Sequence, residues 1–149
     1  MARVLELRAE LVMFLQDAKS DYANRFCDSI WLLKLAFLAN IFSRLNSLNK
    51  NLQGREENIL TAKDQVKVFH AKLRLWSSSL QNNIFESFPC IQKIIEENAS
   101  DQSLVVSAHI PSMTQSLQNL QDKLLTYFPD LHSEADNGRR WILNPFLDK

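Results

Sequence analysis

Apolar residues recur at helical spacing along most of the chain and predict long helices joined by short connections. The longest run extends from Trp31 to Gly54. Within it, one stripe repeats at steps of three and four and is expected to line one helix face: Trp31, Leu35, Leu38, Phe42, Leu45 and Leu52. A second apolar group lies off that stripe, namely Ile30, Leu33, Phe37 and Ile41. Apolar residues on most sides predict that this helix is the central element of the fold.

Polar residues and glycine mark the ends of this helix. Asp28 or Ser29 can cap its first turn by accepting a hydrogen bond from a free backbone N–H group. Gly54 predicts its end, because glycine adopts the left-handed conformation after a helix without a steric penalty.

Four further helices follow from the same periodicity. The first covers residues 3–19, with an apolar stripe of Val4, Leu7, Leu11, Phe14 and Leu15. The third covers about residues 58–79, with Ile59, Val66, Phe69, Leu73, Trp76 and Leu80 at the same spacing. A short fourth begins at Pro89 and directs Ile91, Ile94 and Ile95 inward.

The fifth helix contains prolines at its expected ends. Its apolar residues are Met113, Leu117, Leu120, Leu124 and Tyr127, and Pro129 ends it. Pro111 either starts this helix or kinks a longer one that begins near Gln102. A proline inside a helix costs about 3 kcal/mol, so we favour a break near residues 109–111. The chain has two glycines and four prolines in 149 residues, and strand patterns are scarce. We therefore expect one all-α domain over residues 1–149, a bundle of about five helices with a short hydrophobic C-terminal tail.

Charge restricts the candidate partners. Seventeen basic and seventeen acidic residues give a formal net charge of zero, so any nucleic-acid contact needs a local basic patch. One candidate is a row on one helix face, flanked by Lys72 and formed by Lys63, Lys67, His70 and Arg74. The alternative is an ordinary solvated face, since Glu56 and Glu57 lie one turn upstream. Arg139 and Arg140 beside Trp141 form a second candidate, whose alternative is a loop end before a buried tryptophan.

No enzyme or cofactor motif is present in the sequence. His70, His109 and His132 lack the short spacing of common zinc sites, and no phosphate-binding or nucleophile-elbow motif occurs. Cys27 and Cys90 are expected to be free thiols. The most apolar stretch, residues 30–42, is too short for a membrane span and contains Lys34. We expect no catalytic residue, metal, cofactor, small-molecule substrate or membrane contact.

Seven segments occur along the chain in this order: VLELRAELVMFLQ, WLLKLAFLANIFSRLNSLNKNLQG, NIL, FHAKLRLW, FPCIQKIIEEN, YFPDL and WILNPF. Together they resemble hAT-superfamily transposase-derived proteins. The relevant group includes zinc-finger BED domain-containing protein 5, SCAN domain-containing protein 3 and the general transcription factor II-I repeat domain-containing protein 2-like proteins. The resemblance implies the helical insertion of an RNase H-like transposase region, without the three metal-binding acidic residues of its core. It also implies a nuclear location, and the sequence would otherwise suggest a cytoplasmic one.

These observations lead to three functional hypotheses. The first is a non-catalytic interaction module acting through a protein partner or self-association. An insertion without its parent core would expose apolar surface on the first helix and on the tail, where Trp141, Ile142 and Phe146 would face a partner. The second is a DNA-binding module that uses the basic row. The third, a piece of an active enzyme, requires acidic residues encoded outside this sequence.

Overall fold

The computed structural model describes residues 1–54, 59–97 and 102–132, and these residues are helical wherever they form regular structure. The all-α prediction is therefore confirmed for the described part of the chain. The number of helices exceeds five, because the first predicted helix is divided, one 3-10 helix lies between α2 and α3, and another follows α6. The predicted C-terminal tail lies outside the described residues.

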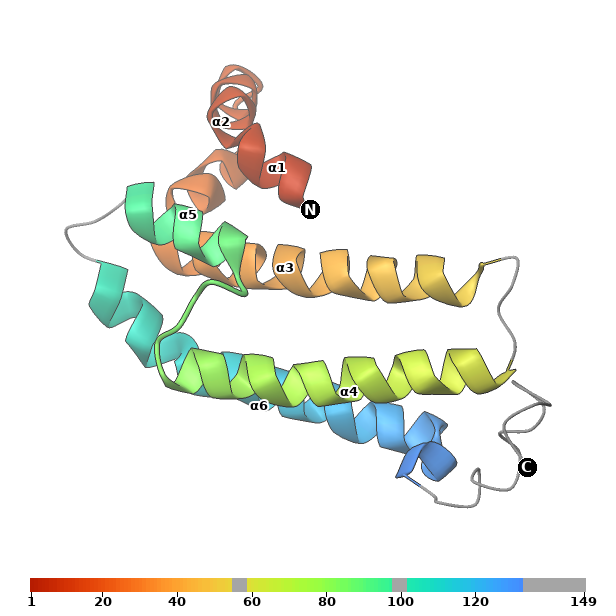
Figure 1. Ribbon diagram of the computed structural model, residues 1–149. Coiled ribbons are helices and arrows are strands. Elements are labelled where there is room, and N and C mark those ends of the chain that lie inside the picture. Colours follow the sequence, from red (N-terminus) through yellow and green to blue (C-terminus); the bar gives the residue numbers. More distant parts are fainter. Residues whose placement is uncertain (55–58, 98–101, 133–149) are drawn as a thin grey trace, which may run out of the picture.

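The N-terminal segment contains two helices where the periodicity predicts one. Helix α1 covers Ala2–Glu6 and α2 covers Arg8–Asp17, and Leu7 separates them with φ −95° and ψ 19°. The 3-10 helix η1 follows at Asp21–Cys27 and is capped by the Ser20 side chain, which accepts from the Tyr22 N–H group. This division turns α2 away from α1 (Figure 1).

Helix α3 covers Ser29–Leu52, close to the predicted range. Asp28, rather than Ser29, caps it, since the Asp28 carboxylate accepts from the N–H groups of Ile30 and Trp31 at 2.9 and 3.2 Å. The position of its end is confirmed, but the reason given for it is wrong, because Gly54 does not adopt a positive φ.

The left-handed conformation instead follows α2 and α4. It is adopted by Lys19, with φ 51°, and by Asn83, with φ 56°. In both places the next N–H group bonds back to a carbonyl five residues earlier, Ser20 to Leu15 and Ile84 to Ser79. This is the Schellman pattern of helix ends, formed here without glycine.

The remaining helices are α4 at Ile59–Gln81, α5 at Pro89–Glu97 and α6 at Gln102–Tyr127, with the 3-10 helix η2 at Pro129–His132. Helix α6 continues through Pro111, so the predicted break near residues 109–111 is wrong. Pro111 is exposed, and the rest of its helix is held by packing against α4. Tertiary contacts therefore offset the local cost of the proline.

Helices α3 and α4 lie roughly side by side, and α6 packs mainly against α4 while also contacting α3 (Figure 1). Helix α5 packs along the N-terminal half of α3. Helices α1 and α2 extend from the same end of the molecule, where α1 contacts α3 and α2 contacts η1.

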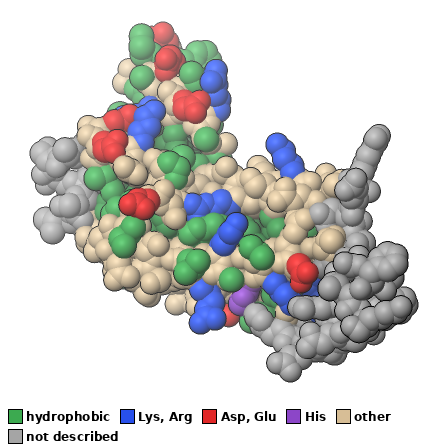
Figure 2. All heavy atoms as spheres, in the orientation of Figure 1, with side chains coloured by type: hydrophobic (Ala, Val, Ile, Leu, Met, Phe, Trp, Pro, Cys, Tyr) green, Lys and Arg blue, Asp and Glu red, His purple; other side chains and the backbone are tan. Residues whose placement is uncertain are grey.

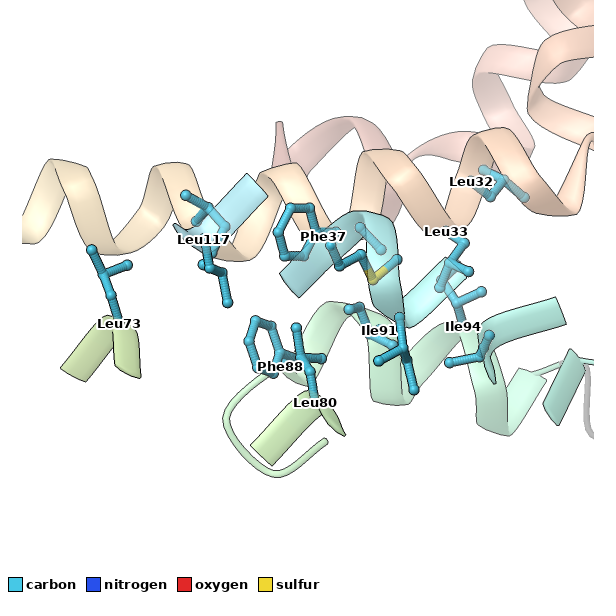
Figure 3. Packing of buried hydrophobic residues seen from close by; sticks show 14 of the residues in the cluster. Leu32, Leu33, Phe37, Leu73, Leu80, Phe88, Ile91, Ile94 and Leu117 are labelled. Atoms are coloured by element: carbon cyan, nitrogen blue, oxygen red, sulfur yellow. The ribbon is translucent and has the colours of Figure 1, made fainter. Parts of the chain in front are cut away.

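The core lies where α3, α4, α5 and α6 meet (Figure 3). Phe37 of α3 and Phe88 before α5 stack with ring centroids 6.3 Å apart. The side chains that are essentially inaccessible to solvent include Leu33, Leu73, Leu80, Ile91 and Leu117. The prediction that α3 is the central element agrees with its contacts to α1, η1, α4, α5 and α6.

The buried face of α3 differs from the predicted stripe. Leu38 and Phe42 belong to that stripe but are 41% and 45% exposed. The neighbouring face is buried instead, through Leu33, Phe37 and Ile41. Phe14 of the first predicted stripe and Tyr127 of the last are also exposed. A helix with two adjacent apolar stripes can bury either one, and here contact with α5 and α6 selects the face.

No single helix in the described ranges is long and apolar enough to cross a membrane. Helices η1 and α3 together are long and apolar enough, but the chain bends by 78° between them.

Candidate interaction surfaces

The predicted basic row on α4 does not form one continuous exposed surface. His70 is only 7% exposed and lies where α4 packs on α6. Its backbone carbonyl accepts a hydrogen bond from the buried Gln121 side chain at 3.4 Å. The helix face that carries the row is therefore used partly for packing.

The other predicted basic residues are distributed around this contact. Lys63 and Lys67 are half-buried, and the Lys67 ammonium lies 4.0 Å from the Asp64 carboxylate. Arg74 is exposed and borders a polar depression that also contains Asp122. Lys72 faces a different depression, between α3 and α4. Arg139, Arg140, Trp141, Ile142 and Phe146 lie outside the described residues.

A groove between α3 and α4, with a volume of about 340 Å³, was not anticipated from the sequence. Leu48, Val68, Phe69 and Trp76 give it an apolar lining. Its charged side chains are Arg44, Asp64 and Lys72. We call this cavity the α3–α4 groove. In Figure 2, basic and hydrophobic side chains lie together in the region between the two helices.

Arg44 is the most unusual side chain of the α3–α4 groove. Its guanidinium carbon lies 3.7 Å from the Trp76 ring centroid and 5.1 Å from that of Phe88, within cation–π distance of both. The Nη1 atom is buried and has no hydrogen-bond partner within the described residues. Burial lowers the pKa of Arg44 from its ordinary value, because desolvation disfavours the charged form.

One signal in the sequence could have identified Arg44. It follows Ile41 by three residues and precedes Leu48 by four, so it interrupts an apolar row of α3 with a charge. A charged residue inside an apolar helical row either extends its end to solvent or finds a partner in the fold. Here the partner is the aromatic face of Trp76 on another helix.

A second exposed surface lies on α2. Glu10, Met13, Phe14 and Asp17 are spaced at positions i, i+3, i+4 and i+7, so they share one side of the helix, and all four are exposed. Met13 and Phe14 are 67% and 68% exposed, which is high for large apolar side chains. We call these four residues the α2 face. Figure 2 shows hydrophobic and acidic side chains on this projecting part of the molecule.

The opposite side of α2 is attached to the rest of the protein. Arg8 pairs with Glu97 at the end of α5, with a nitrogen–oxygen distance of 2.7 Å. Leu11 and Leu15 are half-buried on the same side. The α2 face is therefore held outward by specific contacts.

The described residues contain no group of three or more His, Cys, Asp and Glu side chains arranged to hold a metal ion. Cys27 and Cys90 are both free thiols, the first exposed and the second half-buried. Burial raises the pKa of the Cys90 thiol, and the nearby Glu6 adds to that shift.

Comparison with known proteins gives partial matches. The sequence model of one family, described as the FAM200/GTF2IRD2 helical domain, matches residues 1–81. General transcription factor II-I repeat domain-containing protein 2 of Bos taurus is 33% identical over 92 residues, which cover 62% of this chain and 10% of that protein. The Mus musculus protein of the same name is 29% identical over 94 residues, covering 63% and 10%. This chain thus matches about a tenth of the length of these relatives, and no solved structure matches it.

Proposed function

The chain belongs to the FAM200/GTF2IRD2 helical domain family, and from that premise we propose that it is a non-catalytic interaction module that acts through protein contacts. The hAT-transposase ancestry implied by the resemblance is part of the same proposal. The observation that best supports this proposal is the exposure of two large apolar side chains on α2, Met13 and Phe14, each of which is about two-thirds exposed to solvent. Contiguous exposed apolar side chains bordered by polar ones are typical of protein-interaction sites.

DNA binding through the basic row is the competing proposal. It would rest on Lys63, Lys67 and Arg74, which share one side of α4. Two observations weaken it: His70 in the middle of the row is buried, and Lys67 lies beside Asp64. The zero net charge supplies no general attraction to phosphate.

Sedimentation velocity of the purified chain, alone and with a labelled DNA duplex, separates the two proposals. We expect assembly of the chain with itself and no change in duplex sedimentation at physiological salt. Two results together would overturn the protein-contact proposal. The first is a duplex affinity that falls by about 0.9 log units per log unit of salt for each phosphate contacted. The second is loss of that binding in Lys67→Glu. Lys34→Glu is the matched control, since Lys34 is exposed on α3, away from the row.

A nuclear location is proposed from the relatives, whose name describes them as containing repeats of a general transcription factor. A fluorescent fusion of the chain tests this directly. Accumulation in the nucleus is expected, and exclusion from the nucleus would contradict it.

A further inference from the structure

Arg44, the central cation of the α3–α4 groove, is not paired with an acceptor within the described residues. Arg44 is stacked on Trp76, and its buried Nη1 atom has no hydrogen-bond partner in the described part of the chain. Neither Arg44 nor Lys72 forms an ion pair within those residues. A buried guanidinium N–H group without an acceptor is unfavourable, and a carboxylate is the side-chain group that matches a guanidinium best.

The walls of the α3–α4 groove indicate which class of molecule would supply that carboxylate. Leu48 and Val68 offer apolar contact beyond Arg44. Asp64 borders the same groove, where its carboxylate lies 4.0 Å from the Lys67 ammonium, so Arg44 and Lys72 are the groove cations left for an incoming carboxylate. Apolar walls with one cationic end suit an amphipathic helix that carries an acidic residue.

The chain itself carries a helix of this chemistry. Met13 and Phe14 on the α2 face are apolar, and Glu10 and Asp17 flank them on the same side. Glu10 and Asp17 are separated by seven residues, or about 10 Å along a helix. The same spacing separates Arg44 from Asn51 along the groove wall of α3. The two surfaces therefore match in length and apolar content, and one carboxylate of the α2 face can meet Arg44 while the other meets the side-chain amide of Asn51.

The α2 face cannot reach the α3–α4 groove of its own chain in this fold. Helix α2 lies near the N-terminal end of α3, whereas the groove follows the C-terminal half of α3 (Figure 1). The Arg8–Glu97 ion pair and the contact with η1 hold α2 at that end. The complementary helix must therefore come from another molecule.

We propose that the α3–α4 groove binds the α2 face of a second copy of this chain, with Arg44 paired to Glu10 or Asp17 and with Met13 and Phe14 on the apolar walls. Two reciprocal contacts of this kind close a symmetric dimer. This inference rests on the proposed function, because it names the partner and the site of an interaction module.

Charge reversal tests the pairing in the full chain. Sedimentation velocity over a range of concentrations should show a dimer for the unmodified chain. It is compared with three single variants: Arg44→Glu, Glu10→Arg and Asp17→Arg. A variant that removes the ion pair formed across the interface should weaken dimerisation about thirtyfold or more. One double variant, either Arg44→Glu with Glu10→Arg or Arg44→Glu with Asp17→Arg, should restore the dimer. The double variant that does so defines the direction of the bound helix.

If Arg44→Glu disturbs the fold, substitutions at exposed positions of the same two surfaces test the proposed contact instead. Met13→Lys and Lys72→Glu change exposed side chains, and circular dichroism verifies that both remain helical. We expect both to weaken the dimer, while Glu96→Arg, exposed on α5, leaves it unchanged. Assembly that survives Met13→Lys and Lys72→Glu would overturn this inference and leave the proposed function standing. A monomer up to about 100 μM, where a micromolar dimer would be populated, would overturn it as well. Duplex binding with a steep salt dependence would instead count against the proposed function.

Discussion

The Asn40 side chain of α3 caps α5, which begins almost fifty residues later in the sequence. Its Oδ1 atom accepts a hydrogen bond from the Cys90 backbone N–H group at 3.2 Å, and its Nδ2 atom donates to the Ala36 carbonyl at 3.0 Å. Cys90 is the second residue of α5, where N–H groups have no partner inside the helix. A buried polar residue of the central helix thus supplies the hydrogen bond that the first turn of α5 lacks.

Removing this cap should destabilise the protein. Asn40→Ala leaves the Cys90 N–H group without its acceptor, and we expect the free energy of unfolding to fall by about 1–3 kcal/mol. Urea denaturation followed by circular dichroism measures the change. Asn46→Ala, at an exposed position of the same helix, is the control and should remain within about 0.5 kcal/mol of the parent. Equal midpoints for the two variants would contradict the role of Asn40.

Two leucines of α4 should respond differently to truncation. Leu73 is inaccessible to solvent in the core, whereas Leu75 is 66% exposed. Leu73→Ala removes buried methyl groups and leaves a cavity, so we expect a loss of about 2–5 kcal/mol in unfolding free energy. Leu75→Ala should change it by no more than about 0.5 kcal/mol. A large loss of unfolding free energy in Leu75→Ala would show that the Leu75 side chain is covered in solution.

Pro111 should be a site where substitution stabilises the protein. It lies inside α6 with an exposed side chain, so its replacement removes little packing. Pro111→Ala restores a backbone N–H group and relieves the clash with the preceding turn, which should raise the unfolding free energy by up to about 3 kcal/mol. Thermal melting measures the effect, and Pro129→Ala, outside α6, serves as the control. A lower melting temperature for Pro111→Ala would mean that α6 needs the proline.

The two cysteines should differ in reactivity toward a thiol reagent. Cys27 is exposed, while Cys90 is half-buried and has a raised pKa. Thiolate is the reactive form, so a raised pKa leaves a smaller reactive fraction of Cys90 at any pH below it. Titration with a chromogenic disulfide near neutral pH should show one fast and one slow thiol, and the slow rate should rise with pH. Cys27→Ser should remove the fast phase, and denaturant should make the remaining thiol react quickly.

The sequence predicted some parts of this structure well because they depend on local interactions. The range of α3, the start of α5 at Pro89 and the inward residues Ile91 and Ile94 agree with the structure. Periodicity and capping act within one or two turns of a helix, and the sequence displays both. The division at Leu7 and the continuity of α6 through Pro111 were not predicted, since each depends on packing against other helices.

In the candidate interaction surfaces, too, the features that depend on packing between helices could not be predicted from the sequence. The spacing of Lys63, Lys67, His70 and Arg74 on one helix face could be read from the sequence, but the burial of His70 against α6 could not. The α3–α4 groove was missed for a related reason. Its principal contact joins Arg44 of one helix to Trp76 of another, and no sequence spacing encodes their meeting.

By itself, therefore, the sequence determined that this protein is helical and approximately where its long helices lie, because backbone hydrogen bonds and side-chain periodicity within a helix are local. Only the tertiary structure decided that Leu33, Phe37 and Ile41 are buried while Leu38 and Phe42 are exposed. It also decided that Arg44 lies against an aromatic ring and that Met13 and Phe14 face outward. Each of these outcomes depends on which faces of different helices pack together, and burial of apolar area is a property of that packing rather than of any one segment.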